Sequence, residues 1–143
     1  MTGAAAVVWD DSLARYDFGA GHPLAPIRVQ LAMRLARDLG LIDGDGTTVI
    51  PPVDIGDDAL LTVHEPAYLE SVKRCSADPS HIELHRGLGT DDVPTFAGMH
   101  EASRAVCGAT LAAVQAVHRG DVLHAVNLAG GLHHAMPGAA SGF

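Results

Sequence analysis

Two adjacent histidines, His133 and His134, are the residues in this sequence best suited to chemistry. Neighbouring side chains point about 100° apart on a helix and to opposite faces of a strand. Both imidazoles can therefore serve one site only on irregular backbone, which the preceding Gly130 and Gly131 make available. Imidazoles titrate near neutral pH, so such a pair can pass protons to and from a water molecule. On spacing alone, two surface-loop histidines, or one buried histidine bonded to backbone, are the commoner outcome in a chain with nine histidines.

A second group of polar residues lies where a long loop meets a helix. The loop runs from Asp11 to Pro26 and is rich in glycine and proline. Long ordered loops that follow a strand often carry binding and catalytic residues. His22 and Pro23 fall inside this loop, and Arg28 falls in the first turn of the helix that we expect to start near Pro26. An ion pair to a buried carboxylate is the simple structural alternative for Arg28.

The elements that must position these residues follow from the hydrophobic pattern. Short apolar runs predict parallel strands at 5–9, 47–50 and 122–126. Helices are predicted at 26–39, 59–63, 66–76 and 98–118, with Asp57 as the N-cap of the second. In the first helix, Ile27, Leu31, Leu35 and Leu39 form one apolar stripe, the pattern of a face turned to the core. Residues 77–97 lack a period and predict a second long loop. This alternation predicts an α/β fold with a mainly parallel sheet covered by helices.

Composition excludes several classes of function. The 143 residues carry 9 Lys and Arg against 17 Asp and Glu, a formal charge of −8. Nucleic acids and anionic membranes both require clustered cations, so neither is an expected partner. The N-terminus lacks the basic region of a signal peptide, and the apolar run 4–9 is too short to span a bilayer. The two cysteines form no CxxC motif. We therefore expect a cytoplasmic protein.

Four blocks, in order along the chain, resemble the histone deacetylase superfamily and most nearly its bacterial acetoin-utilisation branch. They are the Gly-His-Pro-x-x-Pro-x-Arg motif at 21–28, His-Glu-x-x-Tyr-Leu at 64–69, the segment 88–102 with its Leu-Gly-Thr-Asp-Asp, and 127–143 with Gly-Gly-Leu-His-His-Ala and Ser-Gly-Phe. The resemblance implies an arginase/deacetylase-type α/β fold. It also implies that residues 1–143 are the N-terminal part of a single deacetylase-like domain.

The resemblance implies a role for each candidate residue. His133 and His134 become the catalytic pair, one a general base and the other its acid or electrostatic partner. Asp92, counted back from Pro94, becomes the carboxylate that binds the backbone amides of the substrate. Asp91 stays open as the alternative, and a turn cap is the structural alternative for Asp92. The remaining roles are the acetyl-lysine tunnel for Gly142 and Phe143, the pocket rim for His22 and Pro23, and the internal cavity behind the metal for Arg28.

The implied activity of the complete domain is zinc-dependent hydrolysis of an acetyl-lysine amide, with release of acetate. The expected partner is therefore an acetylated lysine of a protein substrate. In the family, the zinc ligands and a tyrosine donor lie downstream of the Ser-Gly-Phe segment, so we expect no metal ligands within 1–143. His81 and His85 are four residues apart, but Pro79 and the following glycines disfavour a helix that would bring them together.

Two other functions remain open at this point. One is an acetylpolyamine amidohydrolase, which belongs to the same enzyme class. The other is a non-catalytic chain, either a truncated fragment or an interaction chain. A chain that is truncated before the metal-binding strands would leave unpaired sheet edges, through which we expect self-association.

Overall fold

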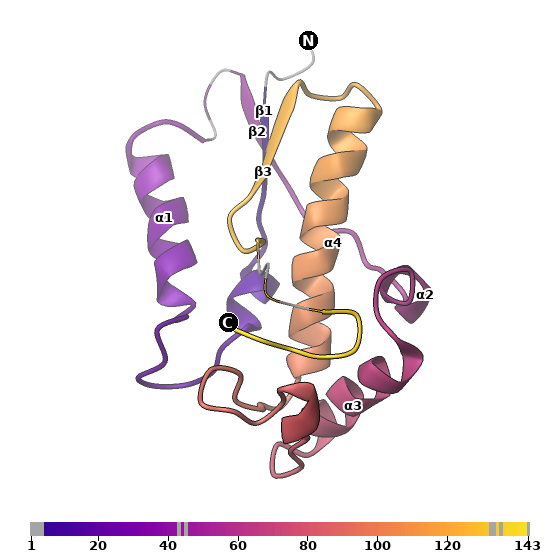
Figure 1. Ribbon diagram of the computed structural model, residues 1–143. Helices are drawn as coiled ribbons and strands as arrows, with labels where there is room; N and C mark the ends of the chain where they lie inside the picture. Colours follow the sequence, from indigo (N-terminus) through magenta and orange to yellow (C-terminus); the bar gives the residue numbers. More distant parts are fainter. Residues whose placement is uncertain (1–4, 43, 45, 132–133, 135, 143) are drawn as a thin grey trace. The chain divides into compact units, whose positions relative to one another are not determined.

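The computed structural model describes residues 5–42, 44, 46–131, 134 and 136–142 (Figure 1). The chain forms two compact units, and each is described by itself. The first unit comprises Met1–Arg15, Pro26–Asp54 and Ala105–Gly130, and the second comprises Tyr16–Ala25, Ile55–Arg104 and Gly131–Phe143. In chain order the elements are β1 (Ala5–Val8), η1 (Asp11–Arg15), α1 (Ile27–Asp38), β2 (Thr47–Ile50), α2 (Asp57–Leu60), α3 (Pro66–Ala77), η2 (Leu84–Arg86), α4 (Met99–His118) and β3 (His124–Asn127).

The first unit contains a parallel sheet in the order β2-β1-β3. Ala5 pairs with Thr47 on one side and with His124 on the other, and the register continues to the strand ends. The carboxyl ends of all three strands therefore meet at one edge, formed by Val8, Ile50 and Asn127. The parallel sheet predicted from the apolar runs is confirmed. The third strand begins two residues later than predicted, at His124.

Small residues allow the sheet and α4 to approach closely. Ala116 of α4 packs with Ala6 of β1 and with Val122, which precedes β3. A Cβ added to Gly108 would lie only 2.1 Å from the carbonyl oxygen of Val53, so the backbone of α4 at Gly108 directly contacts the backbone at Val53. In Figure 1, α1 and α4 lie on opposite sides of the sheet. None of the helices within the described ranges is long and apolar enough to cross a membrane.

The face of α1 that is buried differs from the one expected. The helix itself is confirmed, but the stripe of Ile27, Leu31, Leu35 and Leu39 is 53–64% exposed. Met33 is instead buried, at 1% exposure. At about 100° per residue, Met33 lies on the face opposite the middle of that stripe. Four-residue spacing therefore located the helix correctly but did not identify the side that packs inside this unit.

The second unit is built on α3 and on the chain that follows it. Pro66 stands in the first turn of α3, where its missing N–H costs nothing. The core consists of Tyr68, Val72, Cys75, Leu88, Val93 and Met99. Leu88 and Val93 belong to the segment 77–97 that was predicted as a second long loop, and this loop contains η2 and an antiparallel bridge between Glu83 and Leu88.

The predicted cap of α2 is wrong by one residue. Gly56 occupies the N-cap, and Asp57 is the first helical residue. The Asp57 carboxylate lies 2.6 Å from Lys73 Nζ and 3.2 Å from His100 Nε2. Lys73 and His100 come from α3 and α4, so Asp57 makes tertiary contacts instead of a local cap. The hydrogen bond to Lys73 lowers the pKa of Asp57.

Candidate functional site

His134 is described by the structure, whereas its neighbour His133 and the terminal Phe143 lie outside the described residues. The His134 side chain is exposed and lies against Gly142. A Cβ at Gly142 would lie 2.5 Å from Cγ of the imidazole, and the φ of Gly142 is +64°. Only glycine fits this position without displacing the ring. The structure therefore brings together two residues, eight apart in sequence, that were predicted to share a site.

Asp91 and Asp92 lie at the tip of a loop that is anchored at both ends. Leu88 and Val93 are buried in the core of the second unit. The Gly89 amide donates to the Val93 carbonyl at 2.9 Å, and the Val93 amide donates to Thr90 Oγ1 at 3.1 Å. Both aspartates between these anchors are exposed. The loop therefore presents two carboxylates to solvent from a constrained backbone.

His22 contacts this loop from a segment 70 residues earlier in the chain. Its Nε2 lies 3.2 Å from the carbonyl oxygen of Asp92. Its Nδ1 accepts a hydrogen bond from the Leu24 amide at 3.1 Å, so Nδ1 carries no proton. The proton is then on Nε2, which donates to the Asp92 carbonyl. This pair of bonds selects one tautomer and fixes the backbone at the residue predicted to bind substrate.

An aromatic cluster, which the sequence pattern did not indicate, supports His22. The ring of Phe18 lies 4.5 Å from the His22 ring, centroid to centroid. Tyr16 and Phe96 make edge-to-face contacts with Phe18 and with each other, at 5.2–5.7 Å. Aromatics make up only 4% of the chain, and the available signal was the placement of Tyr16 and Phe18 shortly before His22; Phe96 joins them only in the fold. Pro23 is exposed next to His22.

Backbone hydrogen bonds hold the segment 136–142, which carries Gly142. The Glu65 amide at the start of α3 donates to the Pro137 carbonyl at 2.9 Å. The Ala140 amide donates to the Arg86 carbonyl at 2.8 Å, and Arg86 Nη1 donates to the Gly138 carbonyl at 2.9 Å. Gly87 permits this approach, because a Cβ there would lie 2.0 Å from the Ala140 oxygen. The segment is thus attached to two elements of the second unit.

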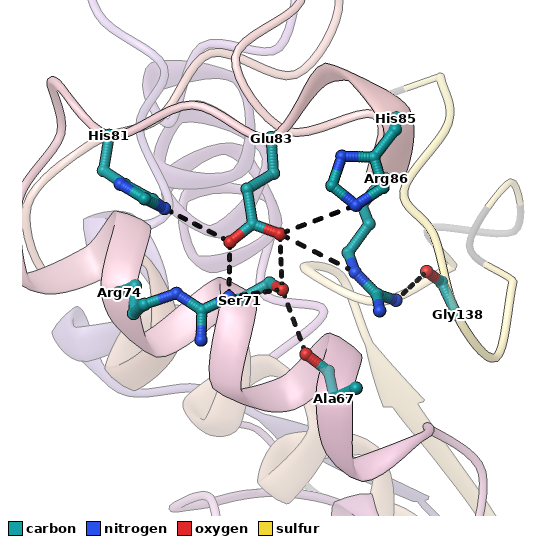
Figure 2. A network of polar contacts seen from close by, with 8 residues as sticks. All are labelled: Ala67, Ser71, Arg74, His81, Glu83, His85, Arg86 and Gly138. Atoms are coloured by element: carbon teal, nitrogen blue, oxygen red, sulfur yellow. Dashed lines mark hydrogen bonds and ion pairs between the residues drawn. The ribbon is translucent and has the colours of Figure 1, made fainter.

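A polar network around Glu83 lies beside these contacts (Figure 2). Arg74, His81, His85, Arg86 and Ser71 surround its carboxylate. The hydrogen bond from the Arg74 guanidinium, with further ones from Ser71 and His81, lowers the pKa of Glu83 to about 2. Sequence reasoning missed this network. Its visible signal in the sequence was a single carboxylate flanked by His81, His85 and Arg86, and Arg74 could not be assigned to it without the fold.

Arg28 belongs to the first unit, where it occupies the first turn of α1 and is exposed. Its role beside a metal stays a prediction. No three His, Cys, Asp or Glu side chains within the described ranges gather in a way that could hold a metal ion. The donor set in this part of the chain therefore does not fit a zinc site.

Comparison with known proteins identifies the family of this chain. The Histone deacetylase domain model matches residues 22–143. The acetoin utilization protein AcuC of Bacillus subtilis is 41% identical over 95% of this chain and 35% of its own length. Histone deacetylase clr6 of Schizosaccharomyces pombe is 31% identical over 94% of this chain and 34% of its own length.

A solved structure gives the same result. The crystal structure of an HDAC homolog from Aquifex aeolicus matches with a TM-score of 0.80 and 28% identity, over 97% of this chain and 37% of that one. The chain thus spans about a third of the length of the curated relatives that it matches. The expected arginase/deacetylase-type fold is confirmed. The chain belongs to the histone deacetylase domain family.

Proposed function

We propose that residues 1–143 form the N-terminal part of a single deacetylase domain that hydrolyses the amide of acetylated lysine in a protein and releases acetate. The observation that carries the proposal is the contact between predicted site residues in the second unit. His22 bonds to the backbone of Asp92, 70 residues later in the chain, and His134 lies against Gly142 within one segment. Residues predicted for one reaction thus lie in contact in pairs.

In this proposal, the histidine pair transfers protons and the loop aspartates bind the substrate. His134, with His133, would remove a proton from the attacking water and return one to the leaving amine, which is general base and general acid catalysis. The carboxylate of Asp92, or of Asp91, would accept hydrogen bonds from the backbone amides of the substrate. His22 would keep this loop in place through the Asp92 carbonyl, with Pro23 at the rim. Gly142 and Phe143 would line the tunnel for the acetylated side chain.

Zinc is the metal that the family resemblance implies, and a catalytic zinc ion normally takes three protein ligands. The described residues offer no such group. We therefore assign zinc binding to the complete domain and no step of the reaction to a metal held by these residues. Arg28 is proposed to line the internal cavity of that complete domain, where a guanidinium could bind the released acetate.

The test uses the full-length protein and an acetyl-lysine peptide. His134→Ala and His133→Ala should each lower kcat by a factor of roughly 10²–10⁴, the usual contribution of general acid–base catalysis. Asp92→Ala should instead raise KM, because it removes a substrate contact. His118→Ala, a change of the same type at an exposed position at the end of α4, is the matched control and should leave both constants unchanged.

The outcomes distinguish the alternatives. Wild-type activity in both His133→Ala and His134→Ala would rule out the catalytic pair. An increase in KM for Asp91→Ala but not for Asp92→Ala would move the substrate carboxylate by one residue. Turnover of an acetylated polyamine in place of the peptide would assign the chain to the acetylpolyamine amidohydrolases.

A second candidate, a non-catalytic interaction chain, is favoured by two features of the first unit. The stripe of Ile27, Leu31, Leu35 and Leu39 on α1 is exposed, and an apolar helix face of this kind can bind another protein surface. Within the described residues, β2 and β3 each pair with β1 alone and leave an outer edge for self-association. A full-length protein that forms oligomers and hydrolyses neither substrate would support this candidate.

A further inference from the structure

The carboxylate of Glu83 is held by groups on both of its oxygens. Oε1 accepts from Arg74 Nη2 at 2.5 Å and lies 3.2 Å from His81 Nε2. Oε2 lies 2.7 Å from the Ser71 hydroxyl and 3.7 Å from Arg86 Nε. The side chain is only 11% exposed. Because each partner restricts the carboxylate in a different direction, the Glu83 side chain is held in place. It can therefore orient the guanidinium of Arg86, with which it pairs (Figure 2).

Arg86 connects Glu83 to the segment 136–142. Its guanidinium faces Glu83 through Nε and donates through Nη1 to the Gly138 carbonyl at 2.9 Å. Its own carbonyl accepts from the Ala140 amide at 2.8 Å. The planar guanidinium can make the first two contacts together because its N–H groups point in different fixed directions. A lysine ammonium at the same position lacks the planar fork of fixed N–H directions, so it would not hold both contacts in this geometry.

The loop that carries Asp91 and Asp92 begins at Leu88, which is bonded to the backbone of Glu83. The Glu83 amide donates to the Leu88 carbonyl at 3.0 Å, and the Leu88 amide donates back to the Glu83 carbonyl at 3.2 Å. Leu88 is 1% exposed, so this end of the loop cannot shift without disturbing the core. The loop 88–93 is therefore held through Glu83, and the segment 136–142 is held through Arg86, which itself contacts Glu83.

We propose that Arg86 is a positioning residue that sets the segment 136–142 relative to the loop 88–93. This inference rests on the proposed function, in which the first segment supports His134 and the second supplies the substrate carboxylate. Arg86 touches neither His134 nor the aspartates in any described contact. It acts through the backbone of Gly138 and Ala140.

The experiment compares Arg86→Lys with Arg119→Lys in the full-length protein. Both changes replace a guanidinium that pairs with a carboxylate by an ammonium, but only Arg86 bonds to Gly138. Arg86→Lys should lower kcat by roughly 10- to 100-fold with KM nearly unchanged, because misplacement of reacting groups by about 1 Å costs up to 10²-fold. Arg119→Lys, at a side chain that is 57% exposed and paired with Asp121 outside this network, should keep wild-type kcat and KM.

Amide hydrogen exchange provides a readout that does not depend on activity. Arg86→Lys should speed exchange within 136–142, including the Ala140 amide, while the amides of α3 and α4 keep their protection. A second variant, Arg86→Gln, retains an N–H donor but removes the cation, and it should show the same selective change. Equal acceleration throughout the second unit would mean that Arg86 serves general stability, and this would overturn the proposal.

The two proposals fail separately. Absence of deacetylase turnover in the wild-type protein would refute the proposed function, and the exchange measurement would still decide the role of Arg86. Exchange unchanged from wild type within 136–142, in either folded Arg86 variant, would overturn the positioning role whatever the activity. Wild-type kcat in Arg86→Lys, in a protein that does turn over substrate, would overturn it as well.

Discussion

Gly87→Ala tests the closest backbone contact of the candidate site. Gly87 has φ +76°, and a Cβ there would lie 2.0 Å from the carbonyl oxygen of Ala140 and 2.9 Å from its carbonyl carbon. Real Cβ atoms essentially never approach within 3.0 Å, so one backbone must move by at least 1.0 Å. Because Ala140 lies two residues before Gly142, this displacement should be transmitted to the contact with His134.

Two separate costs make up the expected loss of stability. A left-handed conformation costs an alanine about 1–2 kcal/mol relative to glycine. Overpacking against backbone adds about 1–3 kcal/mol. Gly120→Ala is the matched control, since Gly120 has φ +73° and nothing within 4 Å of its added Cβ. The control should therefore show the first cost alone, and Gly87→Ala should show both.

Urea unfolding of the full-length variants measures these costs as free energies of unfolding. We expect Gly87→Ala to lose about 2–5 kcal/mol, against about 1–2 kcal/mol for Gly120→Ala. The difference between the two variants isolates the contact with Ala140. Equal losses in the two proteins would refute the close approach of Gly87 to the segment 136–142, and with it the attachment of that segment to η2.

Two further predictions concern stability. Gly108→Ala should destabilise the protein by up to about 2 kcal/mol. A Cβ at 2.1 Å from the Val53 oxygen costs about 1–3 kcal/mol, which the usual gain of about 1 kcal/mol in helix propensity only partly offsets; a higher melting temperature would contradict this contact. Glu83, with its pKa lowered from 4.5 to about 2, binds protons more readily in the unfolded chain, so stability should fall as the pH drops from about 4.5 to about 2. Acid titrations of the unfolding midpoint should show a shallower fall for Glu83→Gln, and identical curves would contradict the lowered pKa.

Periodicity and spacing were sufficient to predict much of the fold. Apolar runs located the three parallel strands, because strands buried on both faces must be apolar throughout. Pro26 marked the start of α1, because proline is accommodated in the first turn of a helix. The four motifs indicated the family, which the domain match over 22–143 confirms. These features depend on neighbours within a few residues, so the sequence contains them directly.

The tertiary structure decided which side chains meet. The stripe on α1 matched the usual pattern of a buried face, yet Met33 on the opposite face is the residue that packs inside, because burial depends on what lies beside the helix. Asp57 was predicted as a cap and instead pairs with Lys73 and His100 from other helices. Glu83 had no predicted role until Arg74 and Ser71, about ten residues earlier on α3, enclosed its carboxylate. Hydrogen bonds and ion pairs act over a few ångströms, so contacts between distant segments exist only once the chain has folded.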